Sequence, residues 1–149
     1  MHIHRTNTQL LALLLALLTF SACVQARSQT AVTTLDSTSW QLVKFHGSDD
    51  TMLTPDDRTK YTIAFNANGR VAVRIDCNRG QGAWKSPGPH QLEVGPLALT
   101  RAMCQPGSLH DQIVKHWPFI RSYLIKDRHL FVSLLADGGI YEFEPMTVH

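Results

Sequence analysis

The sequence predicts an α+β fold, in which seven to eight strands form a mostly antiparallel sheet or a partly open barrel with one short helix. Three observations lead to this prediction. Apolar and polar residues alternate with a period of two over much of the chain after residue 37. Turn-forming pairs such as Asn68-Gly69 separate the alternating runs. A segment that begins near Ser108 changes to helical spacing. After removal of a leader, the 149-residue chain suits one domain.

The leader has the features of a secretory signal peptide over residues 1–23. One firm positive charge, Arg5, precedes an apolar run, LLALLLALLTF, that is too short to span a bilayer as a mature helix. Phe20-Ser21-Ala22-Cys23 is similar to a bacterial lipobox, although Leu is usual in its first position. Val24-Gln25-Ala26 instead fits ordinary signal peptidase. The lipobox makes Cys23 a lipid anchor, whereas the other cleavage makes it an incidental cysteine of a discarded leader.

The expected destination is the bacterial cell envelope. If Cys23 is acylated, the absence of Asp at the next position, Val24, directs the chain to the outer membrane, facing the periplasm, under the general lipoprotein sorting rule. Without acylation, a soluble periplasmic protein is expected. Residues 24–37 are polar and rich in Ser and Thr, which predicts a flexible tether before a domain over residues 38–146.

The charge of the mature chain makes nucleic acid an unexpected partner. The sequence holds 14 Lys and Arg against 12 Asp and Glu, and cleavage removes one of the basic residues. The remaining basic residues form no stripe, because apolar or acidic residues interrupt them.

The register of the hairpin around Asn68-Gly69 can be decided by parity, that is, by whether its loop has an even or an odd number of residues. A two-residue turn would send the apolar residues of its two strands to opposite faces. A three-residue loop, Ala67-Asn68-Gly69, places all of them on one face and puts Gly69 where a left-handed residue is needed. The predicted pairs are Phe65 with Val71, Ile63 with Val73, and Tyr61 with Ile75.

The last third of the chain predicts a three-stranded meander. A turn at Asp127-Arg128 pairs Tyr123 with Val132 and Ile125 with Leu130. A two-residue turn at Asp137-Gly138 then pairs Ala136 with Gly139, Leu134 with Tyr141 and Val132 with Phe143. Further strands are expected at four places, namely Ser39–Phe45, Gly82–Lys85, Gln91–Val94 and Leu97–Arg101.

One helix of about nine or ten residues interrupts the strands. Ser108 is a good N-cap with Asp111 three residues later, and Pro118 stops the run. Leu109, Ile113 and Trp117 fall on one face at intervals of four. Such a short helix is marginal alone, so its apolar face is expected to dock on the sheet or to plug one end of a barrel.

Several motifs together resemble the META domain family, which includes the bacterial heat-shock protein HslJ. They cover nearly the whole chain after the tether, and the most specific is the combination of Cys77-Asn78 with Thr100-Arg101-Ala102-Met103-Cys104. The others are Thr38-Ser39-Trp40-Gln41-Leu42, Tyr61-Thr62-Ile63-Ala64-Phe65, Gly69-Arg70-Val71 and Leu92-Glu93-Val94-Gly95-Pro96-Leu97. The resemblance implies a small envelope domain, often a lipoprotein, with a shape related to the cracked barrels of secretin pilot lipoproteins. It implies links to envelope stress and drug tolerance, and no established enzyme activity.

The only two cysteines beyond the leader, Cys77 and Cys104, are expected to form a disulfide. In an oxidising compartment two such cysteines around a turn-rich segment are more often bridged than free. The alternative is a pair of buried thiols that pack as small hydrophobic groups. A bridge would close a loop of 28 residues, for which chain entropy predicts roughly 3.5 kcal/mol of stabilisation.

The residues after Cys77 have a structural and a functional interpretation. Asn78, Gly80 and Gly82 suit backbone geometry, such as a tight reversal or a bulge beside the cysteine. The functional alternative makes Asn78, Arg79 and Arg101 a small site for an anion or a partner, although such residues are also common on an ordinary solvated surface.

No catalytic residues, metal ligands or cofactor are expected. The six histidines beyond the leader are scattered without ligand spacing, and the acidic pairs near Pro55 lack the pattern of a calcium loop. We therefore expect a non-enzymatic protein that binds an envelope protein or an apolar ligand. The alternatives are a structural or inhibitory module and, last, a Cys/His hydrolase. A deep cavity lined by Trp40, Phe65, Trp117 or Tyr141 would favour an apolar ligand, and a well-packed interior would favour the structural or inhibitory module.

Overall fold

The computed structural model describes residues 34–146, and the structural statements below concern that part of the chain. The predicted signal peptide, the lipid anchor at Cys23 and most of the predicted tether lie outside the described residues. Within the described part, no helix has the length and apolar character needed to cross a membrane.

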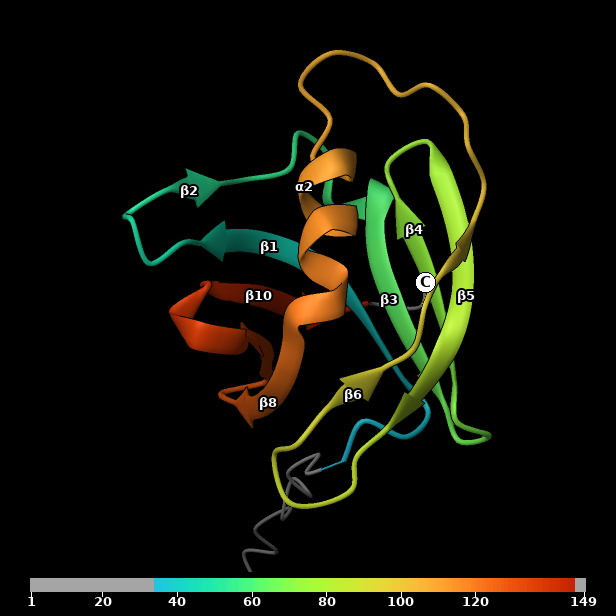
Figure 1. Cartoon of the computed structure of the whole chain (residues 1–149), viewed down its shortest axis with the longest axis vertical. Helices are drawn as coiled ribbons and strands as arrows, with labels where there is room; N and C mark the ends of the chain where they lie inside the picture. Colours follow the sequence, from blue (N-terminus) through green and yellow to red (C-terminus); the bar gives the residue numbers. More distant parts are fainter. Residues whose placement is uncertain (1–33, 147–149) are drawn as a thin grey trace, which may run out of the picture. The chain divides into compact units, whose positions relative to one another are not determined.

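Ten strands form one antiparallel sheet, and Figure 1 shows how it curls around its inner face. Eight of them follow a single path in the order β6-β5-β4-β3-β1-β10-β9-β8, while β2 pairs with β1 and β7 pairs with β5. The strands are β1 (Thr38–His46), β2 (Met52–Leu53), β3 (Tyr61–Asn66), β4 (Arg70–Ile75), β5 (Asn78–Lys85), β6 (Glu93–Val94), β7 (Ala98–Leu99), β8 (Ile120–Lys126), β9 (His129–Leu134) and β10 (Ile140–Pro145).

The two ends of this path meet and nearly close the sheet into a barrel. Gln91 bridges Ser122 of β8. The Leu92 N–H donates to the Arg121 carbonyl at 2.9 Å, and the Tyr123 N–H donates to the His90 carbonyl at 2.8 Å. The predicted α+β fold, a partly open antiparallel barrel with one short helix, is therefore confirmed.

The register of the β3–β4 hairpin is the one that parity predicted. Phe65 pairs with Val71, and the Gly69 N–H donates to the Asn66 carbonyl at 3.1 Å across the three-residue loop. Gly69 has a φ of 74°, in the left-handed region that glycine adopts without strain.

The β8–β9 hairpin is also as predicted, whereas the β9–β10 register is not. Tyr123 pairs with Val132 across the Asp127-Arg128 turn. In the next hairpin Val132 pairs with Tyr141, two positions away from the predicted partner. The cause is a longer loop: Leu135–Asp137 forms a 3-10 turn, η3, and the Leu134 N–H donates to the Gly139 carbonyl at 3.0 Å. A shift of two keeps the parity, so the large residues still share the inner face.

The helix α2 (His110–His116) is seven residues long and continues into a 3-10 turn, η2 (Trp117–Phe119), that contains Pro118. It is shorter than predicted, and Leu109 occupies the N-cap position. The Ser108 hydroxyl still accepts a hydrogen bond from the His110 N–H at 3.1 Å. The predicted apolar face does point to the sheet, because Trp117 is buried and Ile113 packs on the core. A further 3-10 turn, η1 (Arg58–Lys60), precedes β3.

Candidate functional site

The interior of the barrel is almost completely filled. One apolar cavity of about 40 Å³ lies beneath α2, with Trp117 and Tyr141 in its lining. Trp40 and Phe65 are buried in the core and do not line it. Pockets that hold small ligands usually measure about 300 to 1,000 Å³. The cavity is therefore too small for an acyl chain in this conformation.

A polar pair ties α2 to β10 at the edge of this cavity. The Nδ1 atom of His116 lies 2.9 Å from the Tyr141 hydroxyl. The other ring nitrogen of His116, Nε2, lies 3.0 Å from the side-chain nitrogen of Gln112. Burial lowers the pKa of the His116 imidazole, and the neighbouring Lys115 charge lowers it further. Burial also raises the pKa of the Tyr141 phenol well above its usual value. Both groups are thus neutral near pH 7.

The predicted disulfide between Cys77 and Cys104 is present, and the two Cα atoms are 5.4 Å apart. This distance lies within the usual range for a bridge. The disulfide joins the start of β5 to the segment that leads to α2. It therefore fixes the middle of the stretch between β7 and the helix.

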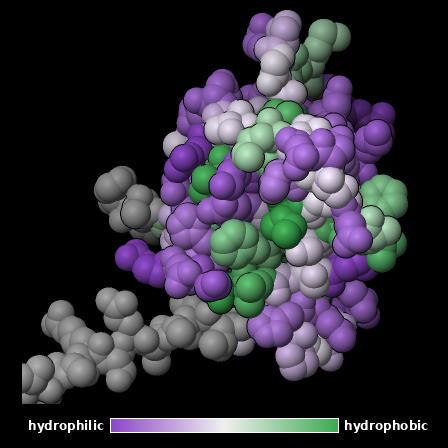
Figure 2. All heavy atoms as spheres, turned by 90° about the vertical axis from the view of Figure 1, so that its left-hand side faces the viewer, coloured by the Kyte–Doolittle hydropathy of each residue, from purple (hydrophilic) through white to green (hydrophobic). Residues whose placement is uncertain are grey.

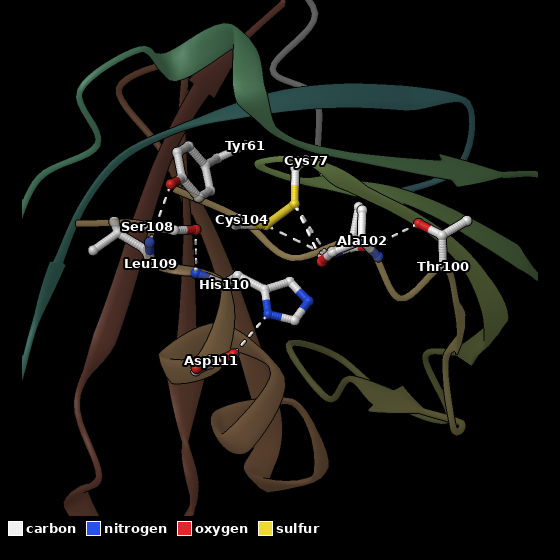
Figure 3. A network of polar contacts seen from close by, with 10 residues as sticks. Tyr61, Cys77, Thr100, Ala102, Cys104, Ser108, Leu109, His110 and Asp111 are labelled. Carbon is white, nitrogen blue, oxygen red and sulfur yellow. Dashed lines mark hydrogen bonds and ion pairs between the residues drawn. A yellow bond between two sulfur atoms is a disulfide. The ribbon is translucent and has the colours of Figure 1, made fainter. Parts of the chain in front are cut away.

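Asn78 fixes the same stretch from inside the sheet. Figure 3 shows the Cys77–Cys104 disulfide next to Ala102, with Thr100 further along this stretch. Its side chain is fully buried. The amide nitrogen donates to the Ala102 carbonyl at 2.9 Å, and the amide oxygen accepts from the Ala102 N–H at 2.8 Å and from the Thr100 hydroxyl at 2.9 Å. The side chain thus replaces a strand partner for Ala102. The predicted tight reversal beside the cysteine is present, because Ile75 pairs with Asn78 across the two-residue turn Asp76-Cys77, whereas Asn78 itself lies in a regular strand without a bulge.

The two glycines that follow allow β7 to lie close to β5. A Cβ atom on Gly80 would lie 2.7 Å from a methyl group of Leu99 and 3.0 Å from the Ala98 carbonyl oxygen. A Cβ atom on Gly82 would lie 3.0 Å from the Pro96 carbonyl oxygen. These glycines are therefore needed for a close approach of two chain segments, rather than for a turn.

The stretch held in this way forms one wall of an open groove of about 660 Å³, which we call the β7 groove. Residues 97–103 make this wall, and His110 and Val114 of α2 also line the groove. Met103 is 96% exposed. The wall is therefore held by a disulfide and by buried hydrogen bonds, although it carries an almost fully exposed apolar side chain.

The structure separates the three residues of the predicted partner site. Arg79 and Arg101 are exposed. They lie on adjacent strand segments, because the Thr100 N–H donates to the Arg79 carbonyl at 2.9 Å. Asn78 is buried between these segments, and its amide is used internally. It can position the groove wall but does not lie on its surface. Sequence reasoning missed Met103, since no periodic pattern marks a single exposed apolar residue.

The outer face of β1, β9 and β10 has a different character, because its charges are largely paired. Glu142 lies 3.3 Å from Lys44 and 2.8 Å from His129. Arg58 lies 2.9 Å from Glu144 and holds the pKa of that carboxyl below its usual value. The face on the left of Figure 1 is mostly hydrophilic, with hydrophobic side chains gathered in separate patches (Figure 2).

The histidines of the described residues do not gather into a metal centre. Among residues 34–146, no three His, Cys, Asp or Glu side chains lie together as metal ligands would. The Nδ1 atom of His110 lies 2.8 Å from Asp111, but this carboxylate is fully exposed.

Comparison with known proteins gives one family and several similar structures. The META domain profile matches residues 33–144. An NMR structure of a protein from Burkholderia xenovorans is 23% identical, with a TM-score of 0.65, and the match covers 76% of this chain and 85% of that one. A crystal structure of a DUF4847 family protein from Bacteroides vulgatus is 14% identical, with a TM-score of 0.54 over 72% of this chain and 92% of that one. No curated protein matches the chain. At these identities the structural likeness concerns the fold.

Proposed function

The chain belongs to the META domain family, and we propose that it is a non-enzymatic, protein-binding module of the bacterial cell envelope. A lipid on Cys23 anchors it to the outer membrane, and its role lies in envelope stress tolerance. The observation that carries the proposal is the β7 groove, whose wall is fixed from two sides while its outer surface stays open.

A fixed wall favours the binding of a protein. Association is opposed by the entropy that is lost when loops and side chains become ordered at an interface. Here the disulfide and Asn78 have already ordered the wall. Binding of a partner therefore costs less conformational entropy. The exposed groups also suit an interface, since Met and Arg are enriched at protein contacts. Met103 and Arg101 supply these groups.

The filled interior favours a protein partner over an apolar ligand. The enclosed apolar cavity of about 40 Å³ is several times smaller than a typical ligand pocket, whereas the β7 groove, at about 660 Å³, is open to the surface, where a segment of another protein can reach it. The sulfur atoms of Cys77 and Cys104 are joined to each other, so neither is a free thiolate nucleophile in the oxidised protein.

Site-specific photo-crosslinking tests the proposal. A photoreactive amino acid replaces Met103 in the full-length chain, expressed in the native host. The matched control carries it at Met52, which is 54% exposed on β2. We expect one adduct of defined mass from position 103, none from position 52, and loss of the adduct in an Arg101→Glu background. No adduct from position 103, or the same adducts from both positions, would contradict protein binding at the groove.

A second measurement separates a protein partner from an apolar ligand. Native mass spectrometry of the protein extracted from membranes reports acylation, disulfide state and any retained molecule together. The proposal expects no stoichiometric small molecule other than the anchor lipid. A lipid retained non-covalently, one per chain, would overturn it in favour of an apolar ligand.

A further inference from the structure

One edge of β7 is free, and the hydrogen-bond pattern identifies the groups that it presents. Leu99 pairs with Gly80 and Ala98 with Gln81. The Thr100 N–H donates to the Arg79 carbonyl, and the Arg79 N–H donates to the Thr100 hydroxyl, so Arg79 and Thr100 occupy a hydrogen-bonded position of the ladder. In an antiparallel ladder such pairs alternate with pairs that do not bond to each other. The N–H and C=O groups of Leu99 therefore point away from β5.

The next outward-pointing residue is Arg101. The main-chain groups of Ala102 face Asn78, so those of Arg101 lie on the same edge as those of Leu99. β7 pairs with β5 alone. Among the described residues, this edge therefore has no strand next to it, although an unpaired edge readily accepts another chain.

The free edge borders the β7 groove rather than a covered surface. β6 and β7 lie on the same side of β5, and the segment before β6 closes the barrel against β8. His110 and Val114 of α2 line the groove together with residues 97–103. His110 also brings an unused polar atom, because its Nε2 is buried without a hydrogen-bond partner among residues 34–146.

The charges around the groove are positive and uncompensated. Arg101 lines the groove, and Arg79 lies on the neighbouring strand segment. Neither has an ion pair within the described part of the chain, and no carboxylate belongs to the groove lining. The nearest acid on α2, Asp111, contacts His110. A ligand with an acidic side chain would complement these charges.

We propose that the β7 groove binds an extended peptide segment of the partner as an additional strand on the free edge of β7. The main chain of the segment bonds to Leu99 and Arg101, and alternate side chains contact the groove. An acidic side chain lies near Arg101 and an apolar one packs against Met103. This inference rests on the proposed function and names the chemistry of the partner.

Selection from a peptide library tests it. A display library of random peptides of about nine residues, a usual strand length, is selected against the full mature chain. Isotope-labelled protein then reports the amide exchange of each residue with and without a selected peptide. We expect enrichment of sequences with alternating apolar residues and at least one acid. We also expect slower exchange at the Leu99 and Arg101 amides, while the Thr100 amide, already bonded, changes little.

Two variants test the charge. Arg101→Glu is expected to weaken the selected peptides about three- to tenfold, whereas Arg128→Glu, at the distant β8–β9 turn, leaves them unchanged. A peptide whose acid is replaced by Lys is expected to bind Arg101→Glu better than the wild type. Equal effects of the two protein variants would overturn the charge assignment and with it the proposed occupant.

Other outcomes overturn the inference while the proposed function survives. Selected peptides that bind as helices, or that leave the Leu99 amide unprotected, would exclude strand addition even if Met103 crosslinks a protein. Failure of the library to yield any peptide that binds at the groove would exclude it as well. Conversely, strand addition by library peptides without a crosslinked partner would contradict the proposed function.

Discussion

Replacing Asn78 by alanine isolates the free energy that the buried amide contributes to the groove wall. The amide makes three hydrogen bonds to nitrogen or oxygen partners, two with the main chain of Ala102 and one with the Thr100 hydroxyl. Each such bond contributes about 1 kcal/mol net. Asn78→Ala should therefore lower the free energy of unfolding by about 3 kcal/mol. Thr100→Val removes one of these three bonds and also the bond that the Thr100 hydroxyl accepts from the Arg79 N–H at 3.0 Å, so it should cost about 2 kcal/mol.

Denaturation in urea, followed by the fluorescence of the buried tryptophans, measures both values. Asn66→Ala on the exposed β3–β4 hairpin is the matched control and should change the free energy by less than about 0.5 kcal/mol. The wall, residues 97–103, should also be cut faster by a protease in Asn78→Ala, because it loses its inner anchor. A loss below about 1 kcal/mol in Asn78→Ala would refute the reasoning, since the amide would then be replaceable by water.

Four further predictions concern other parts of the chain. A Cys77→Ser, Cys104→Ser double variant should lose about 2 to 4 kcal/mol against the oxidised protein in the same urea assay, and reduced wild type should match it. Gly139→Ala should lower the melting temperature sharply, because the new Cβ would lie 2.6 Å from a carbonyl oxygen and an aromatic ring at a φ of +115°; an unchanged value would contradict the packing described. Because the pKa of His116 is lowered, the unfolded chain binds more protons, so stability should be full above about pH 6.5 and fall as the pH drops toward 5, a slope that His116→Gln should reduce. Cys23→Ser should release the protein from membranes, and a native N-terminus at residue 27 would exclude the lipid anchor.

Parity predicted the first hairpin because both strands carry a strict alternation and the loop between them admits one register that keeps the apolar residues together. Phe65 opposite Val71 follows from that constraint alone. The same argument failed at the last hairpin because registers two positions apart keep the same faces. The choice between them depends on loop conformation, and Ala136 adopts a φ of 52° that few would expect of alanine.

The disulfide and the proximity of Arg79 to Arg101 could be predicted from the sequence, but the role of Asn78 could not. Its neighbours in sequence, Cys77 and Gly80, suggested a turn, whereas its partners are more than 20 positions away at Thr100 and Ala102. Contacts of this kind depend on how close β7 comes to β5, which sequence patterns do not encode. The β7 groove was missed for the same reason, since helix and wall meet only in the fold.

The central position of β1 determines when folding can finish. This strand lies between β3 and β10, and its residue Gln41 bonds to Glu144, 103 positions later in the chain. Pairing over such a separation makes folding slow, because a long loop must close first. Both cysteines of the disulfide precede β8, so that bridge can form while the last three strands are still absent. Until β10 arrives, one side of β1 is an unpaired edge, and the newly made chain is most exposed to aggregation in this final step.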